Sequence, residues 1–312
     1  MPPSLLLGLP YELRLMIYAY LFDAGEPDPL TTMRDRDGDE GAGCKKGSAR
    51  TISLRHSEPP SQQLAACTQC FGMPPQPSPP SSPSSSNSGS TNTPLPQPSR
   101  TRYHVMDHSW HRRCVETTYR LANKDAFFCA ELMRVCRDLY EETAEFVYAR
   151  HVFDFGADVE AVRPFFEDLS DATRRRVASV ALYKKGPWRY DCWSDRCEWR
   201  AACTYLRENA SVQHLRLVVQ AGQVVKGQEV EADAPRELSS ADVALLVSIR
   251  HEALLWIGDV VRLKGLRTVD VVPDFGLMPS PQTSNLLVFL AFSASLNTGV
   301  KDFLRERLQL TG

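Results

Sequence analysis

The first amphipathic pattern of the chain lies within its first 21 residues. Apolar side chains recur there at the spacing i, i+3, i+4, i+7, i+8, and they are Leu13, Met16, Ile17, Tyr20 and Leu21. Pro10 suits the first turn of a helix, where its missing N–H costs least, and Glu12 follows near the positive end of the helix dipole. The pattern predicts a helix whose apolar stripe must be covered by other protein.

A second and longer helical pattern runs from about Ala130 to Ala149. One side of this helix is apolar and comprises Leu132, Val135, Cys136, Leu139, Tyr140, Thr143, Phe146 and Val147. The opposite side carries charges, among them Glu141, Glu142 and Glu145. We expect this charged side to face solvent.

From residue 151 onward, strand and helix periods alternate. Apolar residues two positions apart predict short strands over 151–155, 177–183, 212–219 and 266–272. Helical patterns predict helices over 158–169, 195–207, 241–263 and, as a buried helix, 286–296. The spacing of Ser239 and Asp242 predicts a capping box at the start of the 241–263 segment, and Gly265 is expected to end it. Because strands separated by helices pair in parallel through right-handed crossovers, the sequence indicates an α/β fold.

The four predicted strands each contain an apolar pair, beginning at Phe153, Val180, Leu215 and Val269, at uneven intervals of 27, 35 and 54 residues. A regular leucine-rich repeat recurs about every 20–29 residues with an Asn in its turn, so a repeat in this chain is degenerate. We therefore expect the two N-terminal helical segments to pack on an irregular, leucine-rich-repeat-like, mostly parallel sheet with flanking helices. A three-layer, doubly wound sheet is the competing arrangement.

Composition divides the chain into three parts. Positions 74–98 contain nine prolines and eight serines. They have almost no apolar side chains whose burial could offset the conformational entropy lost when a chain becomes ordered. The polar stretch before them, from residue 25, shows no apolar period either. We predict an opening helix over 1–24, a disordered Pro/Ser-rich insertion over 25–100, and an α/β domain over 101–312 that includes the 130–149 helix.

The charge balance disfavours some classes of function. The 312 residues carry 36 Lys and Arg against 38 Asp and Glu, and a net charge of -2 provides no basic field for coating nucleic acid or an anionic membrane. Three consecutive arginines at 174–176 are most simply a solvated turn. Nine cysteines, an odd number at low density, suit a reducing compartment. We expect an intracellular protein, cytoplasmic or nuclear or both, that binds neither nucleic acid nor a membrane.

A weak metal-binding pattern surrounds the Pro/Ser-rich segment. Cys67 and Cys70 form a C-x-x-C pair, and His104 and His108 follow at helical spacing, continued by His111 and Cys114. Two thiolates and two imidazoles are a tetrahedral zinc ligand set, but zinc modules usually close shorter loops. The simpler interpretation is that the chain holds no metal, and a zinc-stabilised binding protein is kept as an alternative.

Motifs for catalysis and nucleotide binding are absent from the sequence. It contains no G-x-S-x-G, no H-E-x-x-H and no dinucleotide-binding glycine pattern after a strand. Gly38, Gly43 and Lys45 only approximate a phosphate-binding loop, because Cys44 separates Gly43 from the lysine. We expect a protein that is not an enzyme, with no catalytic residues and no cofactor.

Two segments together resemble the helices of an F-box. Residues 9–21 read L-P-Y-E-L-R-L-M-I-Y-A-Y-L, similar to the opening pattern L-P-x-E-[LI]-x-x-x-I-x-x-x-L, and residues 132–142 read L-M-R-V-C-R-D-L-Y-E-E, similar to the closing pattern L-x-x-V-C-[KR]-x-[WLF]. Both segments, followed by an aromatic strand at 151–155, resemble an uncharacterised F-box-like family of fungal proteins. The resemblance covers about 40 residues directly, and the chain after residue 155 matches only in its rhythm of strands and helices.

The resemblance implies a protein-interaction role, in which the helix pair docks on a Skp1-type adaptor of a ubiquitin ligase and the following domain presents an unknown protein substrate. The residues that it assigns to the interaction are Leu9, Pro10, Leu13, Ile17, Leu21, Val135 and Cys136. Unlike the short connection within an F-box, 109 residues separate Leu21 from Glu131. The alternative is a structural or scaffold domain in which the same side chains only pack in the core.

Overall fold

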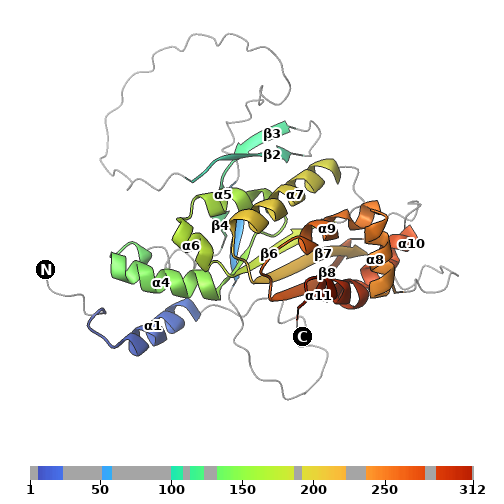
Figure 1. Ribbon diagram of the computed structural model, residues 1–312. Coiled ribbons are helices and arrows are strands. Elements are labelled where there is room, and N and C mark those ends of the chain that lie inside the picture. The colour runs from blue at the N-terminus through green and yellow to red at the C-terminus, as the bar shows by residue number, and fades with distance from the viewer. Residues whose placement is uncertain are drawn as a thin grey trace, which may run out of the picture.

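The computed structural model describes residues 6–23, 51–57, 100–107, 113–122, 132–185, 192–222, 237–277 and 286–310 (Figure 1). These segments form a mixed α/β structure around one mostly parallel sheet, which confirms the predicted fold class. Among the described helices, none is long and apolar enough to cross a membrane.

The central sheet has six strands in the order β4-β1-β5-β6-β7-β8. The strands are β4 (Tyr119–Leu121), β1 (Thr51–His56), β5 (Val152–Asp154), β6 (Ser179–Lys184), β7 (His214–Gly222) and β8 (Thr268–Leu277). The last five in this order are parallel, and β4 is antiparallel to β1. A separate antiparallel hairpin consists of β2 (Tyr103–Asp107) and β3 (Arg113–Thr117).

From β1 to β8 the strands follow one another in chain order, so every parallel crossover steps in the same direction across the sheet. Right-handed crossovers in one direction place the connecting helices on the same face of the sheet. A doubly wound sheet reverses its strand order and is covered on both faces. The observed order therefore favours the irregular, repeat-like arrangement over the doubly wound alternative.

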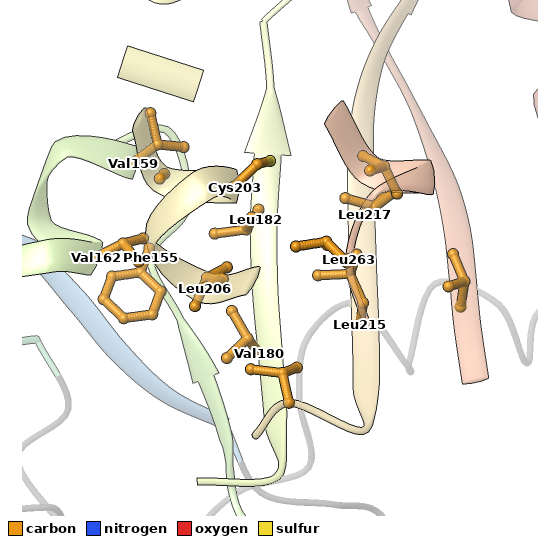
Figure 2. Close-up of a cluster of buried hydrophobic side chains, with 14 of the residues drawn as sticks. Phe155, Val159, Val162, Val180, Leu182, Cys203, Leu206, Leu215, Leu217 and Leu263 are labelled. Atoms are coloured by element: carbon orange, nitrogen blue, oxygen red, sulfur yellow. The ribbon is translucent and has the colours of Figure 1, made fainter. Parts of the chain in front are cut away.

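The face that the helices cover carries the hydrophobic core in two rows. Val180, Leu215 and Val269 lie opposite one another in neighbouring strands, and Leu182, Leu217 and Val271 form the next row. All six side chains are buried. Figure 2 shows Cys203 and Leu206 of α7 interleaved with Leu182 and Val180 of β6, with Phe155 and Val162 beside them. The alternating apolar positions found in the sequence thus form the inner face of the sheet.

The helices that cover this face connect the strands in turn. They are α4 (Arg137–Arg150), η2 (Val159–Ala161), α5 (Val162–Glu167), α6 (Asp171–Arg176), α7 (Cys192–Asn209), α8 (Ser240–Ser248), η3 (Glu252–Leu254) and α9 (Leu255–Val261). Aromatic side chains join them to the sheet and to each other: Tyr148 of α4 stacks on Phe153 of β5, and Trp199 of α7 meets Trp256 of α9 edge to face. The sheet and its helices therefore share one core.

Helical segments also pack at the two ends of the sheet (Figure 1). At the β8 end lie α10 (Leu286–Ala294), η4 (Leu296–Val300) and α11 (Lys301–Arg307). The backbone N–H of Gly222 donates to Ser293 Oγ at 2.9 Å, and a Cβ at Gly222 would lie 2.3 Å from Phe289. Only glycine permits this approach of β7 and α10. At the other end, α1 (Tyr11–Asp23) lies alongside α4.

The second face of the sheet, called the polar face here, carries the alternate side chains of the strands. Ser53, Asp154, Ala181, Arg216 and Asp270 form one row across five strands. Within this row Ala181 is buried, and the other four side chains are half-buried. In the described part of the chain, the core is therefore on one face of the sheet.

The range predicted to be disordered contains a core strand. Residues 51–56 form β1, which lies between β4 and β5 inside the sheet, and Ile52 and Leu54 are buried. The prediction that 25–100 is wholly disordered is therefore wrong at β1, and the folded body includes this strand. The alternation of T-I-S-L is only four residues long and is surrounded by polar sequence. For this reason the pattern of apolar residues did not predict a strand there. The Pro/Ser-rich positions 74–98 lie outside the described residues.

Two predicted helices have different boundaries in the structure. The segment predicted over 130–149 contains a short turn after Leu132, and α4 begins only at Arg137 with Cys136 as its N-cap. The segment predicted over 241–263 is divided into α8 and α9, because Arg250 adopts a left-handed conformation with φ of 56°. The predicted capping box of Ser239 and Asp242 is confirmed at the start of α8.

Candidate functional site

The face of α1 that packs on the protein is not the predicted stripe. Tyr18 is the side chain of α1 that is fully buried, and Leu15 and Ala19 pack half-buried against the core. Arg14 lies on the same side of the helix, four residues before Tyr18. The covered face of α1 therefore combines a tyrosine and an arginine with small and apolar neighbours.

Glu142 of α4 holds this face in place through three hydrogen bonds. The Arg14 guanidinium donates from Nε to Glu142 Oε2 at 3.0 Å and from Nη2 to Oε1 at 2.7 Å. The Tyr18 hydroxyl donates to Glu142 Oε2 at 3.0 Å. Burial and the nearby carboxylate raise the pKa of Tyr18 to about 12, so this hydroxyl keeps its proton. The remaining Nη1 group of Arg14 donates to the carbonyls of Leu7 and Leu9, which anchors the chain before α1.

The opposite face of α1 leaves large apolar side chains in solvent. The exposed fractions are 45% for Leu13, 66% for Met16 and 76% for Tyr20. Tyr11 is also exposed, but it lies on the side of Arg14, whose guanidinium carbon is 5.7 Å from the centroid of the Tyr11 ring. Val135, in the turn before α4, is 63% exposed. Its neighbour Cys136 lies close enough to Tyr18 to affect the tyrosine electrostatically, so this turn and α1 adjoin. The term apolar patch denotes Leu13, Met16 and Tyr20.

The residues assigned to the interaction by the F-box resemblance fall into three groups. Pro10, Leu13 and Val135 are exposed, and Leu9, Ile17 and Cys136 are half-buried. The side chain of Leu21 lies outside the described residues. The expectation that the stripe of α1 is covered is therefore wrong for Leu13, Met16 and Tyr20 within the described structure, and Leu13 and Val135 are not core residues.

Sequence reasoning missed the polar anchor beneath the patch. Glu142 was expected to face solvent, because charges on that side of α4 repeat at helical spacing and the chain offers no local partner for them. Its partners, Arg14 and Tyr18, come from a helix 128 and 124 residues earlier. The one feature of the sequence that could have indicated this contact is Arg14, an arginine within the first helix.

The weak zinc set falls largely outside the described residues, which include His104 but not Cys67, Cys70 or His108. His104 lies on strand β2, opposite Glu116 of β3, and not on the helix that the spacing suggested. Cys114 is buried on β3. Among the described residues, no group of three or more His, Cys, Asp or Glu side chains is arranged to hold a metal ion.

A cluster of titratable side chains at the end of β1 was not anticipated. His56 Nδ1 lies 2.8 Å from the hydroxyl of Tyr103, and His56 Nε2 lies 3.4 Å from Asp158 and 3.6 Å from Glu160. Burial pushes the pKa of Glu160 upward, but interactions with His56 and Glu198 outweigh burial and lower it to about 2. The cluster joins β1, β2 and η2 and so attaches the hairpin to the sheet.

The His56 cluster is accounted for by the ion pairs and hydrogen bonds that hold three elements together.

Comparisons with known proteins return no match for this chain, whether with family models, with curated proteins or with solved structures.

Proposed function

We propose that the chain is a non-enzymatic protein-interaction module of F-box-like type, which docks on a Skp1-type adaptor through the apolar patch. The observation that carries the proposal is the division of α1 into two faces. Tyr18 is buried and hydrogen-bonded to Glu142, whereas Leu13, Met16 and Tyr20 project outward. Isolated exposed apolar residues are ordinary, but three large ones on one face of a rigidly anchored helix are typical of a binding surface.

Exposure of the patch supports docking over the scaffold alternative. If the F-box-like residues served only core packing, Leu13 and Val135 would be buried against each other or against the sheet. Both are largely exposed, while the packing role belongs to Tyr18 and Leu139. The residues of the F-box pattern are thus divided between a supporting layer and an outward layer.

Charge argues for a protein partner and against a lipid surface. Helices that lie on membranes combine an apolar face with Lys and Arg on the polar face. The only cation within α1 is Arg14, and it is occupied by Glu142 and backbone carbonyls. A partner with an apolar surface of its own, such as an adaptor helix, fits the patch better.

The polar face is the proposed platform for the protein substrate. It spans the parallel strands, lies opposite the core, and presents paired charges such as Arg55 with Asp154 at 2.8 Å. Tyr183 reaches across β7 to donate to Asp274 at 2.8 Å, which fixes an aromatic ring among these charges. Fixed polar and aromatic groups on a rigid sheet are suited to recognising a protein surface.

An intracellular location, cytoplasmic or nuclear, is proposed along with this role. Its support is the set of free thiols at Cys136, Cys197 and Cys203, which persist as thiols in a reducing compartment.

The test is a binding assay between the purified chain and a purified Skp1-type adaptor. Met16→Asp places a charge in the middle of the apolar patch without touching Tyr18, and it should abolish binding while the protein remains folded. Ile17→Asp is the less informative variant, because Ile17 is half-buried and its loss would perturb folding as well. An adaptor that binds the wild-type and Met16→Asp chains equally would refute the docking proposal.

A further inference from the structure

A depression of about 620 Å³ opens where α7 and α9 end, at the amino edge of β7 and β8. Its lining consists of Arg207 and Glu208 from the last turn of α7 together with Arg262 and Lys264 from the end of α9. Three cations and one carboxylate give it a net charge of +2, in a chain whose total is -2. We call these four residues the basic depression.

Among the described residues, the carboxylates near the depression are too few for its cations. Arg207 pairs with the adjacent Glu208 at 2.6 Å. Arg262 lies 3.7 Å from Asp259, but the same Asp259 oxygen is 3.8 Å from Arg200 of α7, so one carboxylate serves two guanidinium groups. Within the described residues, Lys264 makes no ion pair. Positive charge is therefore left over where the two helices end.

The helix dipoles explain only part of this charge. A cation near the C-terminus of a helix is stabilised by the negative end of the dipole, and Arg207 and Arg262 occupy such positions on α7 and α9. That effect acts within the last turn of a helix. Arg200 lies two turns before the end of α7, and Lys264 follows α9, so the dipole does not account for either one.

The chemistry of the lining selects the kind of anion. Phosphate groups in proteins are usually held by backbone N–H groups at helix N-termini, whereas this depression lies at two C-termini, where carbonyl oxygens point outward. It has no aromatic side chain on which a base could stack. Arginine forks bind carboxylates in a bidentate manner, and long Arg and Lys side chains reach beyond the helix ends to an extended chain.

We propose that the basic depression binds an acidic segment of a partner protein, a run of Asp and Glu side chains that pair with Lys264, Arg262 and Arg207. This surface is separate from the apolar patch, because α7 and α9 lie away from α1 in the fold (Figure 1). The inference does not depend on the docking of an adaptor. It adds a second interaction surface, whose partner is recognised by charge.

The probe is a fluorescently labelled oligoglutamate peptide, titrated with the full chain while fluorescence anisotropy is measured. Binding should weaken as salt rises toward about 0.15 M, because exposed charges are screened over about 8 Å at that ionic strength. Lys264→Glu reverses the cation that has no ion pair in the described structure, so it leaves no carboxylate without a partner. It should weaken binding roughly fivefold or more.

Arg137→Glu is the matched control. Arg137 is exposed in the first turn of α4, at the other end of the sheet, and its replacement changes the total charge by the same amount. A carboxylate suits that position of a helix, so the variant should fold. An equal loss of binding in both variants would show a non-specific charge effect and overturn the proposal.

Three further measurements complete the test. If Lys264→Glu lowers the thermal midpoint, Arg207→Gln, which keeps hydrogen-bonding capacity, replaces it and should weaken binding in the same direction. Displacement of the peptide by inorganic pyrophosphate at matched ionic strength would overturn the assignment to an acidic polypeptide. Met16→Asp should bind the peptide like the wild type, so failure at the patch and failure at the depression are distinguishable.

Discussion

Arg14 of α1 and Glu142 of α4 form a two-pronged ion pair, with Nε to Oε2 at 3.0 Å and Nη2 to Oε1 at 2.7 Å. Both side chains are mostly covered, at 14% and 20% exposure. The planar guanidinium meets the planar carboxylate edge to edge, which restricts the rotation of one helix against the other. This pair determines which side of α1 faces outward, and hence where the apolar patch lies.

Loss of the anchor should loosen α1. Glu142→Gln retains the shape of the side chain but removes the charge and one acceptor oxygen, so Arg14 loses its bidentate partner. We expect the thermal midpoint to fall by about 5 °C, as measured by circular dichroism. Glu145→Gln is the control, because Glu145 is exposed and its ion pair with Arg176 is long, at 3.7 Å. A Glu142→Gln midpoint equal to that of the control would contradict the anchoring role.

Substitutions on the two faces of α1 should have opposite effects. Met16→Asp lies on the exposed face, and we expect it to abolish adaptor binding with little change in the thermal midpoint. Tyr18→Ala removes a buried ring and should cost about 3–5 kcal/mol of unfolding free energy. Denaturation and binding measured on both variants separate the two roles. Strong destabilisation by Met16→Asp would mean that the patch is part of the core.

Acid should destabilise the protein through Glu160. Its pKa is lowered from 4.5 to about 2 in the folded chain, so its contribution to stability is fully present above pH 4.5 and is lost as the pH falls toward 2. Glu160→Gln removes this titration and should flatten the pH dependence of the unfolding free energy in that window. Denaturant melts across the window measure it. Parallel curves for the wild type and the variant would contradict the expectation.

Glycine at two helix ends should stabilise the protein. Arg250 and Gln309 follow α8 and α11 with φ of 56° and 54°, and each begins a Schellman-type end in which the next N–H bonds back to the helix. Arg250→Gly and Gln309→Gly relieve the left-handed strain, and each should add about 0.5–1 kcal/mol to the unfolding free energy.

Gly265 supplies the reverse control for this prediction. Its φ is 78°, and a Cβ there would meet no atom within 4 Å, so only the backbone conformation would be strained. Gly265→Ala should therefore destabilise the protein by about 1 kcal/mol. Equal melts for Gly265→Ala and the wild type would remove the physical basis of the prediction.

The segment between β1 and the hairpin should be replaceable by a short linker. Ser57 donates its N–H to the carbonyl of Thr118 at 2.7 Å, and the Thr118 hydroxyl donates to the carbonyl of Thr101 at 3.2 Å. Ser57 and Thr101, which lie on either side of the segment, are thus held near each other because both bond to Thr118. A chain in which a short Gly/Ser linker replaces 59–99 should fold with an unchanged or higher thermal midpoint, because a shorter loop costs less to close. Failure of this chain to fold would contradict the prediction.

The sequence determined the parts of the fold that depend on local periodicity. Alternation around Val180, Leu215 and Val269 located three strands, and the capping box at Ser239 located the start of α8. These features were predictable because the side-chain period of a strand or helix is set by its own backbone. Strand β1 was missed because a core strand of six residues carries too short a pattern to stand out from polar sequence.

Only the tertiary structure decided which face of each helix is covered and where the charges pair. A helix with apolar residues on several sides, such as α1, can pack by more than one of them. The face with Tyr18 and Arg14 packs on the protein because Glu142, 128 residues from Arg14, accepts hydrogen bonds from both side chains. Leu13 and Met16 have no side-chain donors that could form such bonds. Contacts between residues so far apart depend on how the sheet brings its elements together, and no local pattern records them.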